Sequence, residues 1–250
     1  YKGKREFKRP LKPFSVGQLL EMPLKNSANT SLYSIPTCDP IKPPTQPLSI
    51  PPFIFGFWFI SRKWNKTLTV PHEFKEKVFE IFKNSGYKVK EKGKYTNNYV
   101  RFVTEPSIWS QLAGRIPTKM PLQYLNASAE QRLDLICGIM CAKPLKKSTK
   151  AGRFVFKSSK KHISTAFQYL SETLGASTIP YFNEHDNNYN VIVHRTPSFL
   201  PEMAEPRPFT HYARRYVKSI QPIPAQLCVH IETDEENGTF LVGEGFIPCH

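Results

Sequence analysis

The sequence is short of several features that would point to a membrane or secreted protein. It has no apolar run of about 18 residues, the length of a membrane-spanning helix, and no amino-terminal signal peptide. Its 5 cysteines are odd in number and widely spread, without a pair of CxxC units. This pattern favours reduced thiols and argues against a structural zinc site. We therefore expect a soluble, intracellular protein, nuclear or organellar rather than secreted, with no membrane partner.

Acidic residues are also scarce. The chain has 20 Asp and Glu against 35 Lys and Arg, which gives a formal net charge of +15. Such an excess predicts an anionic partner, and it favours nucleic acid over a membrane surface. The same composition is compatible with contact to protein subunits of a larger complex. Whether the nucleic acid is DNA or RNA stays open.

Basic residues concentrate in two stretches. In the first, lysines at every second position would share one face of a strand. In the second, no acid interrupts the run. Phosphate contacts from such residues give binding that is sensitive to salt and only weakly dependent on sequence. The candidate nucleic-acid-binding residues are Lys88, Lys90, Lys92, Lys94 and Arg101 in the first stretch, and Lys146, Lys147, Lys150, Arg153 and Lys157 in the second.

The hydrophobic pattern predicts the same order of elements twice. With 40% hydrophobic and 13% aromatic residues, the chain can form a substantial core. Residue periodicity indicates an apolar helix, an amphipathic helix and a hairpin in each half, which is a pseudo-twofold α+β arrangement. The predicted helices span 51–62, 70–86, 105–114 and 163–175, and a further helix begins at Ser128 and includes the run 135–144. The hairpins span 87–103 and 178–195, and a strand spans 153–157.

Two of these helices are apolar nearly all round and carry a central glycine. The second of them begins with a capping box, in which Ser128 and Gln131 each satisfy a backbone donor near the other. Gly138 lies in its middle, and Gly56 lies in the middle of the first. A glycine inside a helix costs about 1 kcal/mol relative to alanine unless close packing offsets it.

The run 135–144, LICGIMCAKP, and the run 51–62, PPFIFGFWFISR, together resemble the two motif helices of LAGLIDADG homing endonucleases of the intein-borne, DOD type. The resemblance implies two αββαββα-like halves whose sheets lie in the DNA major groove. It also implies that the two helices pack through small residues, here Gly56 and Gly138. In that family each helix ends in an acid that holds a divalent metal over DNA.

The resemblance places Ser61 and Lys143 where the family has its acids. A serine hydroxyl is a poor ligand for a hard divalent cation, and a lysine ammonium brings positive charge to its position. Between Met140 and Lys150 the sequence has no Asp or Glu. We therefore expect no catalytic residue, no metal and no cofactor; Mg²⁺ enters only if the protein is a functional endonuclease after all.

The end of the chain resembles the closing strands of an intein splicing domain, or Hint domain. The runs 216–224 and 239–250 carry this resemblance, and His250 matches the family's penultimate histidine. The family's final Asn, opening Cys or Ser and Thr-x-x-His segment are missing, so His250 would be a splicing remnant. Because the chain starts with Tyr1, we expect a segment of a longer protein.

These observations give one preferred hypothesis and two alternatives. The preferred hypothesis is that the protein is catalytically inactive and derived from an intein and its homing endonuclease. It would bind nucleic acid, or be a structural part of a nucleic-acid-containing complex. The alternatives are a functional site-specific endonuclease, and part of a self-splicing intein whose missing residues lie outside the segment. The predicted divisions are a basic segment and Pro-rich linker at 1–50, the first half at 51–115, the second half at 116–196, and a connector with Hint-like strands at 197–250.

Overall fold

The computed structural model describes residues 12, 14–36, 40–62, 66–96, 98–112, 117–147, 153–194, 214–224, 240–242 and 247–249. The chain forms two compact units. One unit is Asp39–Glu205, and the other combines Tyr1–Cys38 with Pro206–His250. The sequence predicts a boundary after residue 50, whereas the structure groups residues 39–50 with the helices that follow. None of the described helices is long and apolar enough to cross a bilayer.

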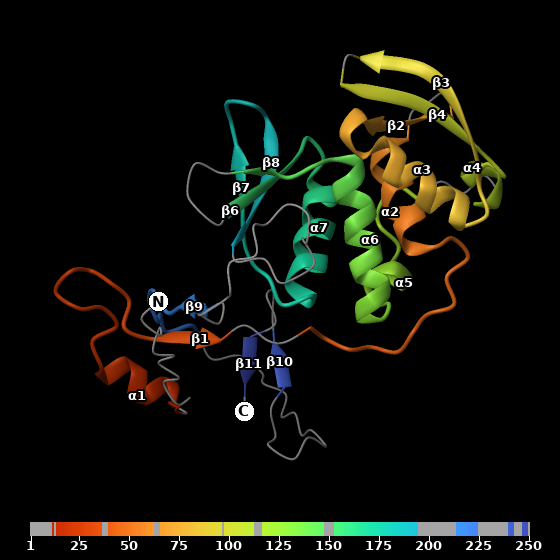
Figure 1. Ribbon diagram of the computed structural model, residues 1–250. Helices are drawn as coiled ribbons and strands as arrows, with labels where there is room; N and C mark the ends of the chain where they lie inside the picture. The colour runs from red at the N-terminus through yellow and green to blue at the C-terminus, as the bar shows by residue number, and fades with distance from the viewer. Residues whose placement is uncertain are drawn as a thin grey trace, which may run out of the picture. The chain divides into compact units, whose positions relative to one another are not determined.

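The larger unit is an α+β structure with two antiparallel sheets (Figure 1). Its first half contains α2 (Pro52–Ser61), β2 (Leu68–Pro71), a short 3₁₀ helix (His72–Phe74), α3 (Lys75–Asn84), β3 (Lys88–Thr96), β4 (Tyr99–Glu105) and α4 (Ile108–Gln111). Its second half contains α5 (Leu122–Leu125), α6 (Ala129–Ala142), β5 (Lys146–Lys147), β6 (Arg153–Ser158), α7 (Lys161–Thr173), β7 (Ser177–Asn183) and β8 (Asn188–His194).

The two halves repeat one topology. In the first sheet the strand order is β2-β4-β3, and in the second it is β5-β6-β8-β7. In each half, the strand that precedes the amphipathic helix pairs with the second strand of the hairpin that follows that helix. The predicted duplicated α+β arrangement is therefore present, but β2 occupies the start of the segment 70–86 that the sequence predicts to be helical throughout. The described residues give the first half one strand fewer than the second.

One face of each sheet packs on helices. In the first sheet Phe102 lies against Phe57 of α2 and Phe82 of α3, with ring centroids 5.9 and 5.5 Å apart. In the second sheet Phe156 stacks on Phe167 of α7 at 4.1 Å. Alternation along the strands places the intervening residues on the opposite face.

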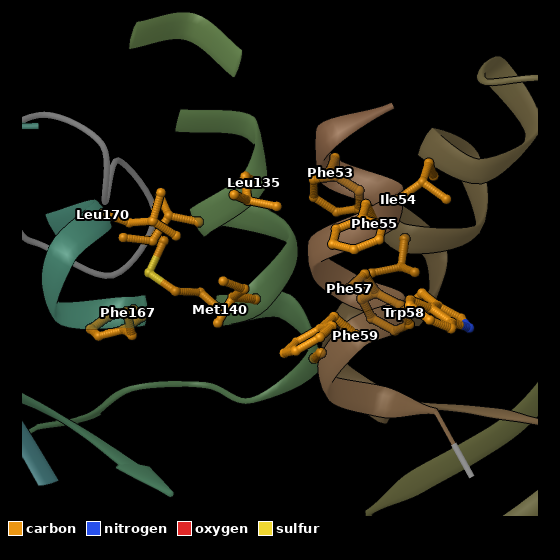
Figure 2. Close-up of a cluster of buried hydrophobic side chains, with 14 of the residues drawn as sticks. Phe53, Ile54, Phe55, Phe57, Trp58, Phe59, Leu135, Met140, Phe167 and Leu170 are labelled. Atoms are coloured by element: carbon orange, nitrogen blue, oxygen red, sulfur yellow. The ribbon is translucent and has the colours of Figure 1, made fainter. Parts of the chain in front are cut away.

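The core centres on α2 and α6 (Figure 2). Every residue of α2 from Phe53 to Phe59 is buried, so the all-round apolar pattern reflects a helix enclosed on several sides. Phe55 stacks on Tyr124 at 4.0 Å, and the Tyr124 hydroxyl donates to the Ile50 carbonyl at 3.0 Å. The aromatic ring is thus buried while its polar end is satisfied.

The segment before α2 is fastened to α6 by paired hydrogen bonds. Gln46 N donates to Gln131 Oε1 at 2.9 Å, and Gln131 Nε2 donates to the Gln46 carbonyl at 2.8 Å. The buried Arg132 guanidinium donates to the carbonyls of Ala127 and Ile41. Gln131 also closes the predicted capping box with Ser128. These bonds explain why residues 40–50 belong to the helical unit although their composition resembles a linker.

The smaller unit is built from both ends of the chain. It contains α1 (Val16–Glu21), β1 (Ser34–Pro36), β9 (Arg214–Tyr216), β10 (Phe240–Val242) and β11 (Ile247–Cys249). β1 pairs antiparallel with β9, and β10 pairs antiparallel with β11. The larger unit is therefore an insertion in sequence between two paired strands. His250, the predicted splicing remnant, lies outside the described residues.

A basic centre and two basic sheet faces

The two glycines predicted at a helix interface do lie at one. A β-carbon added to Gly56 would overlap the Leu135 carbonyl oxygen, and one added to Gly138 would overlap the Phe53 carbonyl oxygen. The same added atom on Gly138 would lie 2.9 Å from the Phe57 backbone nitrogen. The backbones of α2 and α6 therefore touch, and only glycine leaves enough room for this approach.

The two helices run in the same direction, as Figure 2 shows from Phe53 and Leu135 at one end to Phe59 and Met140 at the other. Their carboxyl ends therefore lie at the same end of the pair. Ser61 is the last residue of α2, and Lys143 is the residue that caps α6. The structure thus brings both positions to one end of the helix pair.

The amino end of α7 lies near the carboxyl ends of α2 and α6. Tyr169, near the end of α7, donates a 3.0 Å hydrogen bond to Asn126, just before α6 begins. Since α6 and α7 pack together, this contact makes them antiparallel. Lys160 and His162, at the start of α7, consequently lie near the end of α6.

Positive side chains lie at the ends of these three helices: Arg62 follows α2, Lys143 caps α6 with Lys146 close to it, and Lys160 and His162 begin α7 with Lys119 close to His162. We call these six residues the basic centre. Burial lowers the pKa of His162, and the charges of Lys160, Lys119 and Arg62 lower it further. Burial likewise lowers the pKa of Lys143, and Lys146 adds to the effect. Among the described residues, no acid forms an ion pair with any member of the basic centre.

The residues at these helix ends do not fit a divalent metal. Magnesium and calcium require oxygen ligands, mostly carboxylates. Ser61 offers one hydroxyl and is only 4% exposed, while Lys143 offers a cation. Within the described ranges, no group of three or more His, Cys, Asp or Glu side chains is arranged to hold a metal. Asp134 lies near the opposite end of α6, and burial raises the pKa of its carboxyl.

The first sheet corrects the prediction that four lysines share a face. Lys88 and Lys90 pair with Glu105 and Val103, on the face away from the core. β-bulges after Glu91 and after Lys94 then shift the alternation. Lys94 therefore pairs with Val100, whose side chain lies in the core. Residues spaced by two lie on the same face of a strand only while the hydrogen-bond ladder with the partner strand is regular.

Arg101 lies on the outer face of the first sheet. It pairs with Thr69, whose hydroxyl donates to the Ser61 carbonyl at 3.4 Å. Its guanidinium carbon lies 5.7 Å from the centre of the Tyr95 ring, and its buried Nε has no hydrogen-bond partner among the described residues. The strand that neighbours Arg101 is thus hydrogen-bonded to the end of α2.

The outer face of the second sheet mixes charge with exposed apolar groups. Lys157, Asn190 and Tyr181 lie side by side on three neighbouring strands. Tyr181 is 40% exposed and Ile179 is 50% exposed. Asn190 is only 1% exposed, and its amide has no partner within the described part of the chain. Lys157 Nζ is 3.0 Å from Asp186 Oδ2, so this lysine is partly neutralised.

The remaining predicted nucleic-acid-binding residues are described only in part. Lys146 is exposed and pairs with Val155. For Lys147 and Arg153 only the backbone, in β5 and β6, is described, and Lys150 lies outside the described residues. Lys92 is exposed and is the extra residue of the first bulge. The sequence does not predict the grouping of Arg62, Lys119 and His162, because they come from three separate segments and only the fold unites them.

Comparison with known proteins gives a distant structural likeness. No protein-family model matches the chain, and no curated protein matches it. Mesophilic variants of the homing endonuclease I-DmoI share 12% identity, cover 58% of this chain and 82% of their own, and give a TM-score of 0.38. I-DmoI in complex with DNA and Mn shares 12% identity, covers 58% and 89%, and gives a TM-score of 0.40. At this identity and TM-score, the likeness does not establish the family of this chain.

Proposed function

We propose that this chain is a catalytically inactive nucleic-acid-binding protein of LAGLIDADG type, which contacts the phosphate backbone and does not cut it. The observation that carries the proposal is the meeting of two glycine-packed parallel helices at an end that holds Arg62 and Lys143, neither of which forms an ion pair with an acid among the described residues. A metal-assisted nuclease needs carboxylates at such a place to hold its metal over the phosphate. The basic centre and the lysines of the sheet faces attract phosphate instead.

The outer faces of the two sheets supply the remaining contacts. Lys88, Lys90 and Arg101 lie on the face of the first sheet away from the helices. Lys157, Tyr181 and Lys146 lie on the corresponding face of the second sheet. Basic side chains position a protein along the backbone, while exposed aromatic and apolar groups can contact bases or sugars.

The test is binding of the full chain to fluorescently labelled duplex DNA and structured RNA, followed by anisotropy across a salt series. We expect affinity that falls steeply as salt rises, and the preferred polymer identifies the partner. A variant in which Lys88 and Lys90 are changed to Gln should show a shallower salt dependence, by about one unit for each phosphate that is no longer neutralised. No binding of either polymer at low salt would overturn the proposal and favour protein subunits as partners.

A second candidate function is supported by the smaller unit. β1 precedes the larger unit in the chain, β9 follows it, and the two strands pair through Ser34 and Tyr216, Ile35 and Arg215, and Pro36 and Arg214. An intein splicing domain interrupted by an endonuclease would have this organisation. Fusing flanking test sequences to a longer chain that restores an opening Cys and a final Asn tests this candidate. Excision with ligation of the flanks supports it, and an unprocessed product rejects it.

A further inference from the structure

The guanidinium of Arg62 is held in place by contacts that use only some of its N–H donors within the described part of the chain. Its Nη2 donates to the Pro117 carbonyl at 3.0 Å, and its guanidinium carbon lies 4.6 Å from the Trp58 ring centre and 4.7 Å from that of Phe59. Arginine has five N–H donors in a planar fork, and stacking fixes the plane. The buried Nη1 has no partner among the described residues. A buried donor of this kind ordinarily has an acceptor.

The start of α7 adds positive electrostatic potential that no acid in its first turn offsets. α7 is 13 residues long, its N-cap residue Lys160 makes no side-chain cap, and its first turn holds no acid. The amino end of a helix carries partial positive charge and free N–H groups, which favour an anion. Here it carries Lys160, Lys161 and His162 instead, so side-chain and helix charges have the same sign.

Stabilisation of helix ends does not account for this arrangement. Cations are favourable at the carboxyl ends of helices, so Arg62 and Lys143 could serve α2 and α6 in that way alone. The same reasoning makes Lys160 and His162 unfavourable at the amino end of α7. The positive charges of these side chains repel one another, and in the described part of the chain no ion-paired acid offsets them. An anion that binds among them would reduce this repulsion.

We infer that the basic centre is a phosphate-binding site that works without a metal ion, with Arg62, Lys119, Lys160 and His162 as its ligands. The inference rests on the proposed function, since a phosphodiester of bound nucleic acid would be the natural occupant. Among the described residues, no group of three or more His, Cys, Asp or Glu side chains could hold a divalent cation, so the side chains of the basic centre contact the phosphate oxygens directly. Arginine suits this role because its fork matches two oxygens at once.

The experiment uses the full chain with inorganic pyrophosphate as the probe and NMR of the histidine ring as the readout. Pyrophosphate added in EDTA should shift the His162 signals in a saturable manner. Lys119→Gln and Lys160→Gln should each weaken the apparent affinity about threefold to tenfold, as expected when one charge-assisted hydrogen bond is removed. Both side chains are exposed, so these variants should fold. Lys83→Gln on α3, also exposed, removes the same charge elsewhere and should leave the affinity unchanged.

The outcomes separate this inference from the proposed function. If nucleic acid binds but pyrophosphate leaves the His162 signals unchanged, the phosphate site is rejected and the proposed function stands. If pyrophosphate binds and nucleic acid does not, the site stands and the proposed function falls. Equal loss of pyrophosphate affinity in Lys83→Gln and Lys119→Gln would show general charge attraction, and it would overturn the site. Pyrophosphate binding that requires Mg²⁺ would overturn the metal-free mode.

Discussion

Gly138 of α6 lies directly against the carbonyl oxygen of Phe53 in α2. Gly56 makes the reciprocal approach to Leu135. These two reciprocal contacts hold the helix backbones together, and the parallel packing brings Ser61 and Lys143 to the same end of the pair. The packing and the chemistry at the helix ends therefore depend on one interface.

Gly138→Ala should destabilise the larger unit. Alanine favours an isolated helix by about 1 kcal/mol, but its methyl group would overlap backbone atoms of α2. Because backbone cannot move aside as a flexible side chain can, we expect a net loss of about 1–3 kcal/mol in the free energy of unfolding, measured by urea denaturation. Gly17→Ala in α1 is the control, since its added atom would meet only Ser15 Oγ at 3.7 Å. Equal effects of the two substitutions would contradict the close packing.

Tyr124 should make stability depend on alkaline pH. Burial raises the pKa of Tyr124 to about 12 from an ordinary value of 10.0. The raised pKa means that the folded state favours the neutral phenol. Its contribution is therefore complete below pH 10 and is lost as the pH rises from about 10 through about 12. Unfolding free energies measured across this range should fall more steeply for the wild type than for Tyr124→Phe, and parallel curves would refute the assignment.

Asp186→Asn should strengthen binding to nucleic acid. Asp186 accepts a hydrogen bond from Lys157, which lowers the pKa of the Asp186 carboxyl and ties up a cation on the sheet face. Removing the carboxylate releases Lys157 for phosphate, so the slope of log affinity against log salt should steepen by about one unit. Glu184→Gln removes a nearby negative charge that has no ion pair among the described residues. It should change the slope less, and identical changes would mean that only net charge matters.

The register of β3 predicts unequal roles for its lysines. Lys90 lies on the outer face with Val103, whereas Lys94 pairs with Val100 after a bulge. Lys90→Gln should therefore weaken nucleic-acid binding more than Lys94→Gln, in anisotropy titrations at one fixed low salt concentration. If the two variants bind alike, the outer face of the first sheet is not the contact surface.

Local sequence patterns predict the elements of this fold better than their relationships. Apolar periodicity and a central glycine identify α2 and α6, and a capping box marks where α6 begins, because these are local signals. The bulge at Gly93, where φ is +91°, is not predicted, since an isolated glycine in a strand does not reveal how the partner strand is registered. Likewise the meeting of Arg62, Lys119 and His162 follows from the antiparallel packing of α6 and α7, which no local pattern contains.

The central claim is that this chain binds nucleic acid and leaves it uncut. The most direct measurement incubates the full chain with a pool of random-sequence DNA duplexes in Mg²⁺ or in EDTA, recovers the bound fraction and sequences all DNA ends. We expect equal recovery in Mg²⁺ and EDTA at matched ionic strength, with intact ends throughout. New ends at a recurring sequence, formed only in Mg²⁺, would contradict the claim and show a working nuclease site.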